Sequence, residues 1–103
     1  MPRAYVLSDV TLKNADAVTA YRVLAARSIA AFGGRYIVRG GAIEVFEGSW
    51  QPSAIVIVEF PDAAAARAWY SSPQYAKALA LRDAALTRNL LLVEGADEEP
   101  DLA

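Results

Sequence analysis

The sequence predicts an α+β fold in which four strands and two helical regions follow one another in the order β-α-β-β-α-β. Two patterns predict this order: stretches rich in β-branched residues with alternating character, and stretches in which apolar residues recur every three or four positions. At 103 residues the chain has the length of one domain. Hydrophobic residues make up 55% of it and charged residues 21%, so we expect a packed core.

The first strand is expected over residues 4–12, where side chains alternate between two faces. An amphipathic helix follows over residues 15–32, with Asn14 as its N-cap. The glycine pair 33–34 ends this helix, because glycine accepts the left-handed conformation that a helix C-terminus often needs.

The second strand is expected to begin at Arg35 and to continue as far as Gly48. We interpret the glycine pair 40–41 inside it as a kink or bulge. The alternative is a two-residue hairpin turn, which would add a fifth strand for which this topology has no position. With Tyr36 and Val38 facing the helices, the arginines on either side of them would face the opposite way.

Residues 54–60, "AIVIVEF", form the strongest predicted strand, and they are apolar on both faces, as is typical of a central strand. The second helical region begins after Asp62 and is split in two at Ser72-Pro73, because serine suits an N-cap and proline the first helical position. Its second part extends to about Leu86, and residues 89–94 form the last strand.

Right-handed crossovers and short hairpins make the economical arrangement a ferredoxin-like split βαβ: an antiparallel sheet with the helices on one face. Ile57 and Val58 then lie on opposite faces, and the helices cover only one of them. We therefore expect a homodimer that packs sheet face against sheet face, forming a dimeric α/β barrel. The domain is expected to span residues 1–95, followed by an acidic flexible tail over 96–103.

Several classes of function are disfavoured by composition. The chain contains no Cys and no His, so we expect no metal site, no cofactor held by such ligands, no thiolate nucleophile and no imidazole base. Neither a signal peptide nor a membrane span is evident, which indicates a cytoplasmic protein without membrane contact. Nucleic-acid binding is disfavoured, because Ile55 and Ile57 occupy the positions where stacking aromatics would be needed.

A series of short motifs extends over about nine-tenths of the chain. The motifs are "AY" at 4–5, Tyr21, "GGRYIVRGG" at 33–41, "EG-S-W" at 47–50, "EF" at 59–60, "AWYSSPQY" at 68–75, Arg82 and "VEG" at 93–95. With these motifs the chain resembles the domain-of-unknown-function family DUF1330, within the dimeric α/β-barrel superfamily. The resemblance implies a homodimer whose sheets enclose a cleft. No reaction is established for that family, and distant relatives include cofactor-free monooxygenases, isomerases and haem proteins.

Five residues are candidates for a ligand site in that cleft: Tyr5, Asp9, Arg39, Trp50 and Glu59. A few polar groups beside apolar walls are typical of small-molecule pockets. Arg39 would bind an anion, or it would lie at a solvated edge or pair with an acid across the dimer. Glu59 would pair with an arginine, which is the favoured interpretation, or act as a base of raised pKa.

Arg82 is expected to be held by a carboxylate, because it shares an apolar helix face with Tyr75. The candidates are Glu59, Glu94 and Glu47, and the alternative is that Arg82 reaches water from a boundary position.

Two functional hypotheses follow. The first is a homodimer that binds a small, anionic metabolite between its sheets. The alternative is a cofactor-independent enzyme, isomerase-like or monooxygenase-like, with Glu59 or Asp9 as base and Arg39 as the electrostatic stabiliser. A dimeric interaction protein without a ligand is a third possibility.

Overall fold

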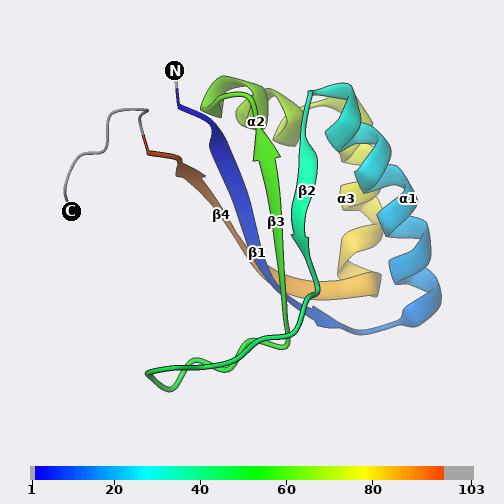
Figure 1. The fold of residues 1–103 in the computed structure, drawn as a ribbon. Helices are drawn as coiled ribbons and strands as arrows, with labels where there is room; N and C mark the ends of the chain where they lie inside the picture. The colour runs from blue at the N-terminus through cyan, green and yellow to red at the C-terminus, as the bar shows by residue number, and fades with distance from the viewer. Residues whose placement is uncertain (1, 97–103) are drawn as a thin grey trace.

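The computed structural model describes residues 2–96. Its elements, in chain order, are β1 (Ala4–Leu12), α1 (Ala15–Ala31), β2 (Arg35–Arg39), β3 (Ala54–Phe60), α2 (Ala63–Tyr70), α3 (Pro73–Ala85) and β4 (Leu86–Glu94) (Figure 1). Apart from Ala96, the predicted acidic tail lies outside the described residues.

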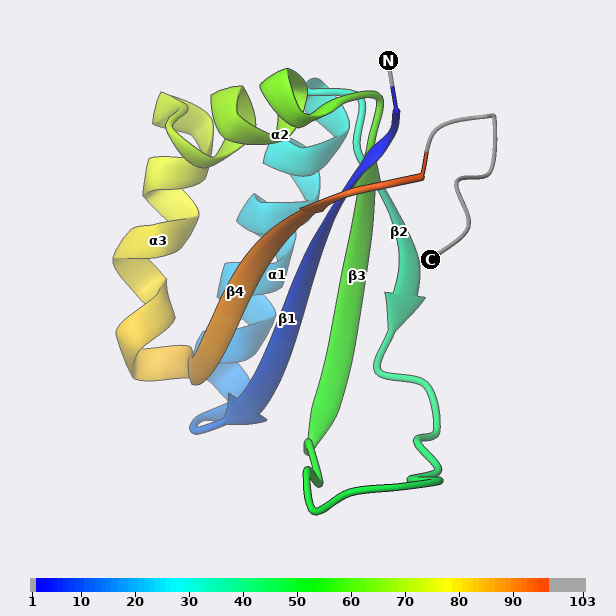
Figure 2. The ribbon, with the colours of Figure 1, turned by 90° about the vertical axis from the view of Figure 1, so that its left-hand side faces the viewer.

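The four strands form one antiparallel sheet in the order β2-β3-β1-β4. Helices α1 and α3 pack side by side on one face of this sheet, and α2 crosses over one end of it (Figures 1 and 2). The predicted α+β class, the split βαβ topology and the divided second helix are therefore confirmed. Within residues 2–96, no helix has both the length and the apolar character needed to cross a membrane.

Each helix begins at a capping residue that the sequence predicts. Asn14 accepts a hydrogen bond from the Ala17 amide at 2.9 Å, and Asp62 accepts one from the Ala65 amide at 2.8 Å. Ser72 accepts one from the Tyr75 amide at 3.0 Å, directly before the proline that opens α3. These bonds satisfy amides that have no partner inside their own helix.

The glycine pair after α1 is required by conformation and by packing. Gly33 has a φ of 78°, in the left-handed region that favours glycine. A Cβ atom on Gly34 would lie 2.7 Å from the Phe60 ring and 2.7 Å from Ile29 Cγ2. The chain can therefore turn closely over the core only where no side chain is present.

The core lies between the sheet and the helices, around the indole of Trp69. That ring lies 5.4 Å from the Phe60 ring and 4.1 Å from the Tyr75 ring, measured between centroids. Its Nε1 donates a 3.0 Å hydrogen bond to Ser28 Oγ, so the polar atom of this buried ring is satisfied. Trp69 is therefore a core residue.

The second strand differs from the prediction in length and in phase. It ends at Arg39 rather than near Gly48. A bulge interrupts its pairing with β3 between Tyr36 and Val38, so that Tyr36 lies opposite Val58 and Val38 lies opposite Ile57. One extra residue in a strand of period two moves every later side chain to the other face. The expectation that Tyr36 and Val38 share a face is therefore wrong.

Residues 41–53 form a long arm without a helix or strand, which projects beyond the end of the sheet (Figure 2). Gly40, directly before the arm, has a φ of 71°, and its amide donates to the Ile55 carbonyl at 3.0 Å. The pair 40–41 is thus neither a bulge within a long strand nor a hairpin turn. The arm leaves apolar side chains exposed, and Phe46 is 87% exposed.

Within residues 2–96, no helix or strand covers the face of the sheet opposite the helices (Figures 1 and 2). We call it the open face. Its apolar side chains come from all four strands: Val38, Ile55, Ile57, Tyr5, Leu7, Leu91 and Val93. Leu91 is 55% exposed, and Val93 is nearly as exposed. A surface of this character is unusual on a protein that stays monomeric.

Candidate functional site

Four of the five predicted site residues lie on the open face, in two separate pairs. Tyr5 lies opposite Glu59 in the β1–β3 register. Asp9 lies further along β1, on the same face as Tyr5 and Leu7. Trp50 comes from the arm, and its Nε1 donates to Asp9 Oδ2 at 3.3 Å. Alternation alone therefore placed Tyr5, Asp9 and Glu59 on one face, but the structure does not bring the two pairs together in one site.

Glu59 is the centre of a polar cluster on the open face. Its Oε1 accepts hydrogen bonds from Arg35 Nε at 2.9 Å and from Arg3 Nη1 at 3.5 Å, while its Oε2 accepts one from the Tyr5 hydroxyl at 3.3 Å. The hydrogen bond from Arg35 lowers the pKa of Glu59 below its ordinary value, against the opposing effect of burial. Glu59 is thus a paired carboxylate, as the favoured interpretation predicts, and it has no raised pKa that would suit a base.

The lowered pKa of Glu59 predicts an acid-sensitive contribution to stability. A carboxylate with a depressed folded pKa stabilises the fold above the ordinary carboxyl pKa, and this contribution is lost as the pH falls through the folded value. We expect the difference in the free energy of unfolding between wild type and Glu59→Gln to be largest near about pH 7 and to decrease toward about pH 3. Urea denaturation across this range measures this difference, and pH profiles that run parallel would contradict the prediction.

Arg39 does not join the other four residues. After the bulge it lies opposite Val56, on the side of the sheet that faces the helices. There its guanidinium carbon lies 4.1 Å from the centroid of the Tyr36 ring, a cation–π contact. The expectation that Arg39 shares a cleft with Glu59 is corrected by this geometry.

Arg82 pairs with a different carboxylate from those predicted. Its Nε donates to Asp83 Oδ1 at 3.3 Å, and the Asp83 side chain is almost fully exposed. Glu59, one of the predicted partners, is held by Arg35 and Arg3 instead. The predicted internal partners of Arg82, Glu94 and Glu47 among them, are therefore wrong, because the adjacent residue on the same helix end supplies the contact.

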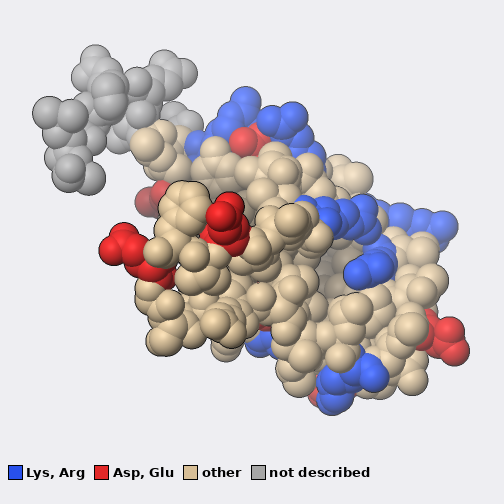
Figure 3. Space-filling model, turned by 60° about the horizontal axis from the view of Figure 1, so that its bottom comes forward, with Lys and Arg blue, Asp and Glu red and all other residues tan. Residues whose placement is uncertain are grey.

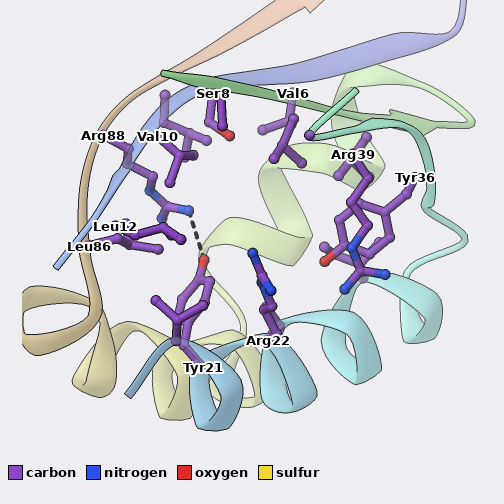
Figure 4. A pocket seen from close by; sticks show the side chains of 18 of the residues that line it. Val6, Ser8, Val10, Leu12, Tyr21, Arg22, Tyr36, Arg39, Leu86 and Arg88 are labelled. Carbon is purple, nitrogen blue, oxygen red and sulfur yellow. Dashed lines mark hydrogen bonds between the residues drawn. The ribbon is translucent and has the colours of Figure 1, made fainter. Parts of the chain in front are cut away.

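A cavity of about 270 Å³ lies between the helix-facing side of the sheet and α1 (Figure 4). Its walls are mostly aliphatic. The sheet contributes Val6, Val10, Val56 and Val58, and α1 contributes Val18, Ala25 and Ile29. An apolar enclosure with few polar groups is the usual form of a small-molecule site.

All charged side chains that line the cavity are positively charged. Arg22, Arg39 and Arg88 line it, and no Asp or Glu is among its lining residues. Figure 4 places Arg88 at one end, Arg39 over Tyr36 at the other, and Arg22 between them on α1. Blue side chains border the hollowed part of the surface in Figure 3. The cavity is therefore electropositive.

Arg88 and two tyrosines form the most tightly bonded polar group of the structure. Arg88 Nη1 donates to the Tyr21 hydroxyl at 2.7 Å, and Nη2 donates to the Tyr75 hydroxyl at 2.6 Å. The two hydroxyl oxygens lie 2.7 Å apart. Burial, together with the neighbouring Tyr21, raises the pKa of Tyr75 above its ordinary value, so that its hydroxyl stays neutral.

Sequence reasoning missed this group. Tyr21 and Tyr75 fall on the apolar stripes of their helices, a pattern typical of core residues. Arg88 precedes the predicted start of the last strand. The three residues come from α1, α3 and β4, far apart in the chain. A tyrosine on each of two helices that share one sheet face was the only available signal.

An antiparallel sheet in the order β2-β3-β1-β4, with its helices on one face and a cavity beneath them, defines a ferredoxin-like α+β protein. The chain belongs to the family described as Domain of unknown function (DUF1330), whose model matches residues 3–96. No curated protein shows significant similarity to it.

Solved structures share the fold at low sequence identity. RPA0582, a protein of unknown function from Rhodopseudomonas palustris, is 21% identical, with a TM-score of 0.76 over 93% of this chain and 84% of that one. SnoaB, a cofactor-independent oxygenase from Streptomyces nogalater, is 18% identical, with a TM-score of 0.62 over 98% of this chain and 100% of that one. A dimeric ferredoxin-like protein of unknown function from Thermobifida fusca is 13% identical, with a TM-score of 0.60 over 90% and 91%.

Proposed function

We propose that the protein is a homodimer that binds a small organic anion with an apolar body in the cavity between the sheet and α1. The observation that carries the proposal is the lining of that cavity: three arginines, no acidic residue and aliphatic walls. This location differs from the inter-sheet cleft that the sequence predicts, because the bulge in β2 moves Arg39 to the helix side.

The partial burial of Arg88 favours an anion. A guanidinium taken partly out of water is costly unless a counter-charge compensates it. Arg88 is half-buried and bonds only neutral hydroxyls among the described residues. A carboxylate or enolate would accept charge-assisted hydrogen bonds from it. The volume of about 270 Å³ lies near the lower end for ligand sites, which favours a molecule of one or two rings.

A binding experiment with aromatic acids tests the proposal. We expect benzoate and phenylacetate to raise the melting temperature of the wild-type protein, and benzyl alcohol at the same concentration to raise it less. Arg88→Met removes a cavity guanidinium and should abolish the shift. Arg27→Met removes an exposed arginine of α1 that does not line the cavity, and should preserve it. Equal shifts in both variants would refute binding at this site.

The homodimer part of the proposal is supported by the open face and by the dimeric state of a protein with the same fold. The apolar side chains on that face come from all four strands; those of β2 and β4 are exposed, and those of β1 and β3 are half-buried. The Thermobifida fusca neighbour is a dimeric ferredoxin-like protein. Packing two such faces together around a two-fold axis would remove this surface from water.

A second candidate function is cofactor-independent oxygenation, which the fold similarity to SnoaB favours. An electropositive cavity would stabilise an enolate or phenolate, the electron-rich form of such a substrate. Glu59 and Asp9 lie on the opposite face of the sheet, so the acidity of the substrate itself would have to supply the anion. Oxygen uptake with acidic hydroquinones, compared between wild type and Arg88→Met, tests this function; equal rates would contradict it.

A further inference from the structure

We propose that the Tyr21 hydroxyl is a preorganised hydrogen-bond donor aimed into the cavity, and that it selects a ligand oxygen that only accepts hydrogen bonds. This inference rests on the proposed function and names the group that the site recognises. It follows from counting the protons in the Arg88–Tyr21–Tyr75 group.

In this group only the direction of the Tyr21–Tyr75 hydrogen bond is left open. Arg88 has no acceptor atom, so it donates to both hydroxyl oxygens. The contact between the two hydroxyls uses one further proton, from either Tyr21 or Tyr75. Two hydroxyl protons are present, so one is left over, and it belongs to whichever tyrosine accepts in the shared bond.

Burial decides which tyrosine keeps the spare proton. Tyr75 is 0% exposed, and its hydroxyl has only Tyr21 and Arg88 as partners among the described residues. A spare proton on Tyr75 would therefore be buried without an acceptor, which is costly. Tyr21 lines the cavity, where a ligand or water can accept its proton. The direction is thus Tyr75 to Tyr21, and from Tyr21 into the cavity. Figure 4 shows the Tyr21 side chain in the cavity, with its hydroxyl bonded to Arg88.

This arrangement defines the ligand group. Tyr21 already accepts from Arg88 and from Tyr75, so both lone pairs of its oxygen are occupied and it can only donate. Accepting two hydrogen bonds strengthens its own donation through cooperative polarisation. Arg88, beside it, also only donates. A carboxylate or enolate oxygen fits this pair of donors, whereas an ammonium group does not.

The direction of the hydrogen bonds can be tested without any ligand. In Tyr21→Phe, both Arg88 Nη1 and the Tyr75 hydroxyl lose their acceptor, whereas in Tyr75→Phe only Arg88 Nη2 does. We therefore expect Tyr21→Phe to lower the urea midpoint of unfolding more than Tyr75→Phe. An equal or larger drop for Tyr75→Phe would overturn the proposal, because it is the result expected for the reverse direction.

Calorimetric titration with benzoate tests the ligand contact itself. A hydrogen bond to a charged group is worth about 1.5–3 kcal/mol, so Tyr21→Phe should bind benzoate about ten- to a hundredfold more weakly than wild type. Tyr75→Phe keeps the cavity donor and should lose much less. Similar losses in both variants would overturn the donor role of Tyr21. If wild type binds no aromatic acid, the proposed function fails, while the urea comparison still decides the direction.

Discussion

Replacing Trp69 with alanine is expected to lower the free energy of unfolding by about 3–5 kcal/mol. The indole is 2% exposed and packs against the Phe60 and Tyr75 rings, so its loss leaves a large void. The change also leaves Ser28 without its indole donor. Since a domain of this size has about 5–15 kcal/mol of total stability, this is a large fraction of it. Urea denaturation followed by circular dichroism measures the loss.

Trp50→Ala is the matched control for this experiment. Trp50 is 60% exposed on the arm, and its indole makes one long hydrogen bond to Asp9 at the surface. The same chemical change should therefore cost about 1 kcal/mol or less in the free energy of unfolding. Comparable losses for the two substitutions would show that the core does not centre on Trp69.

Ile57→Asp is expected to convert the proposed homodimer into a monomer at micromolar concentration. Ile57 lies between Leu7 on β1 and Val38 on β2, near the middle of the open face. Burying an unpaired carboxylate there would cost several kcal/mol, which raises the dissociation constant of the dimer more than about a hundredfold. Analytical ultracentrifugation measures the change in mass.

Val23→Asp makes the same change at an exposed valine of α1, on the helix side of the sheet, and should leave the dimer intact. Circular dichroism would show whether both variants remain folded. A wild-type protein that sediments as a monomer, or an Ile57→Asp protein that stays dimeric, would rule out assembly through the open face.

Local signals predicted the order and type of the elements, although not the end of β2. The helix starts could be predicted because the side chains of Asn14, Asp62 and Ser72 each accept a hydrogen bond from a backbone amide a few residues later. This contact depends only on local chain geometry. Strands β1 and β3 could be predicted because the alternation of their residues indicates which side chains face the core. The topology followed, because few arrangements connect these elements without crossing.

Tertiary structure decided which charged and polar residues line the cavity. A single bulge between Tyr36 and Val38 placed Arg39 on the helix side, and no local motif marks that extra residue, because pairing with β3 determines it. Likewise, Arg88 meets Tyr21 and Tyr75 only once α1, α3 and β4 have packed together. The sequence by itself determined the elements, their order and the faces of the regular strands. The electropositive cavity depends on strand register and on contacts between distant segments, which are set by packing rather than by neighbouring residues.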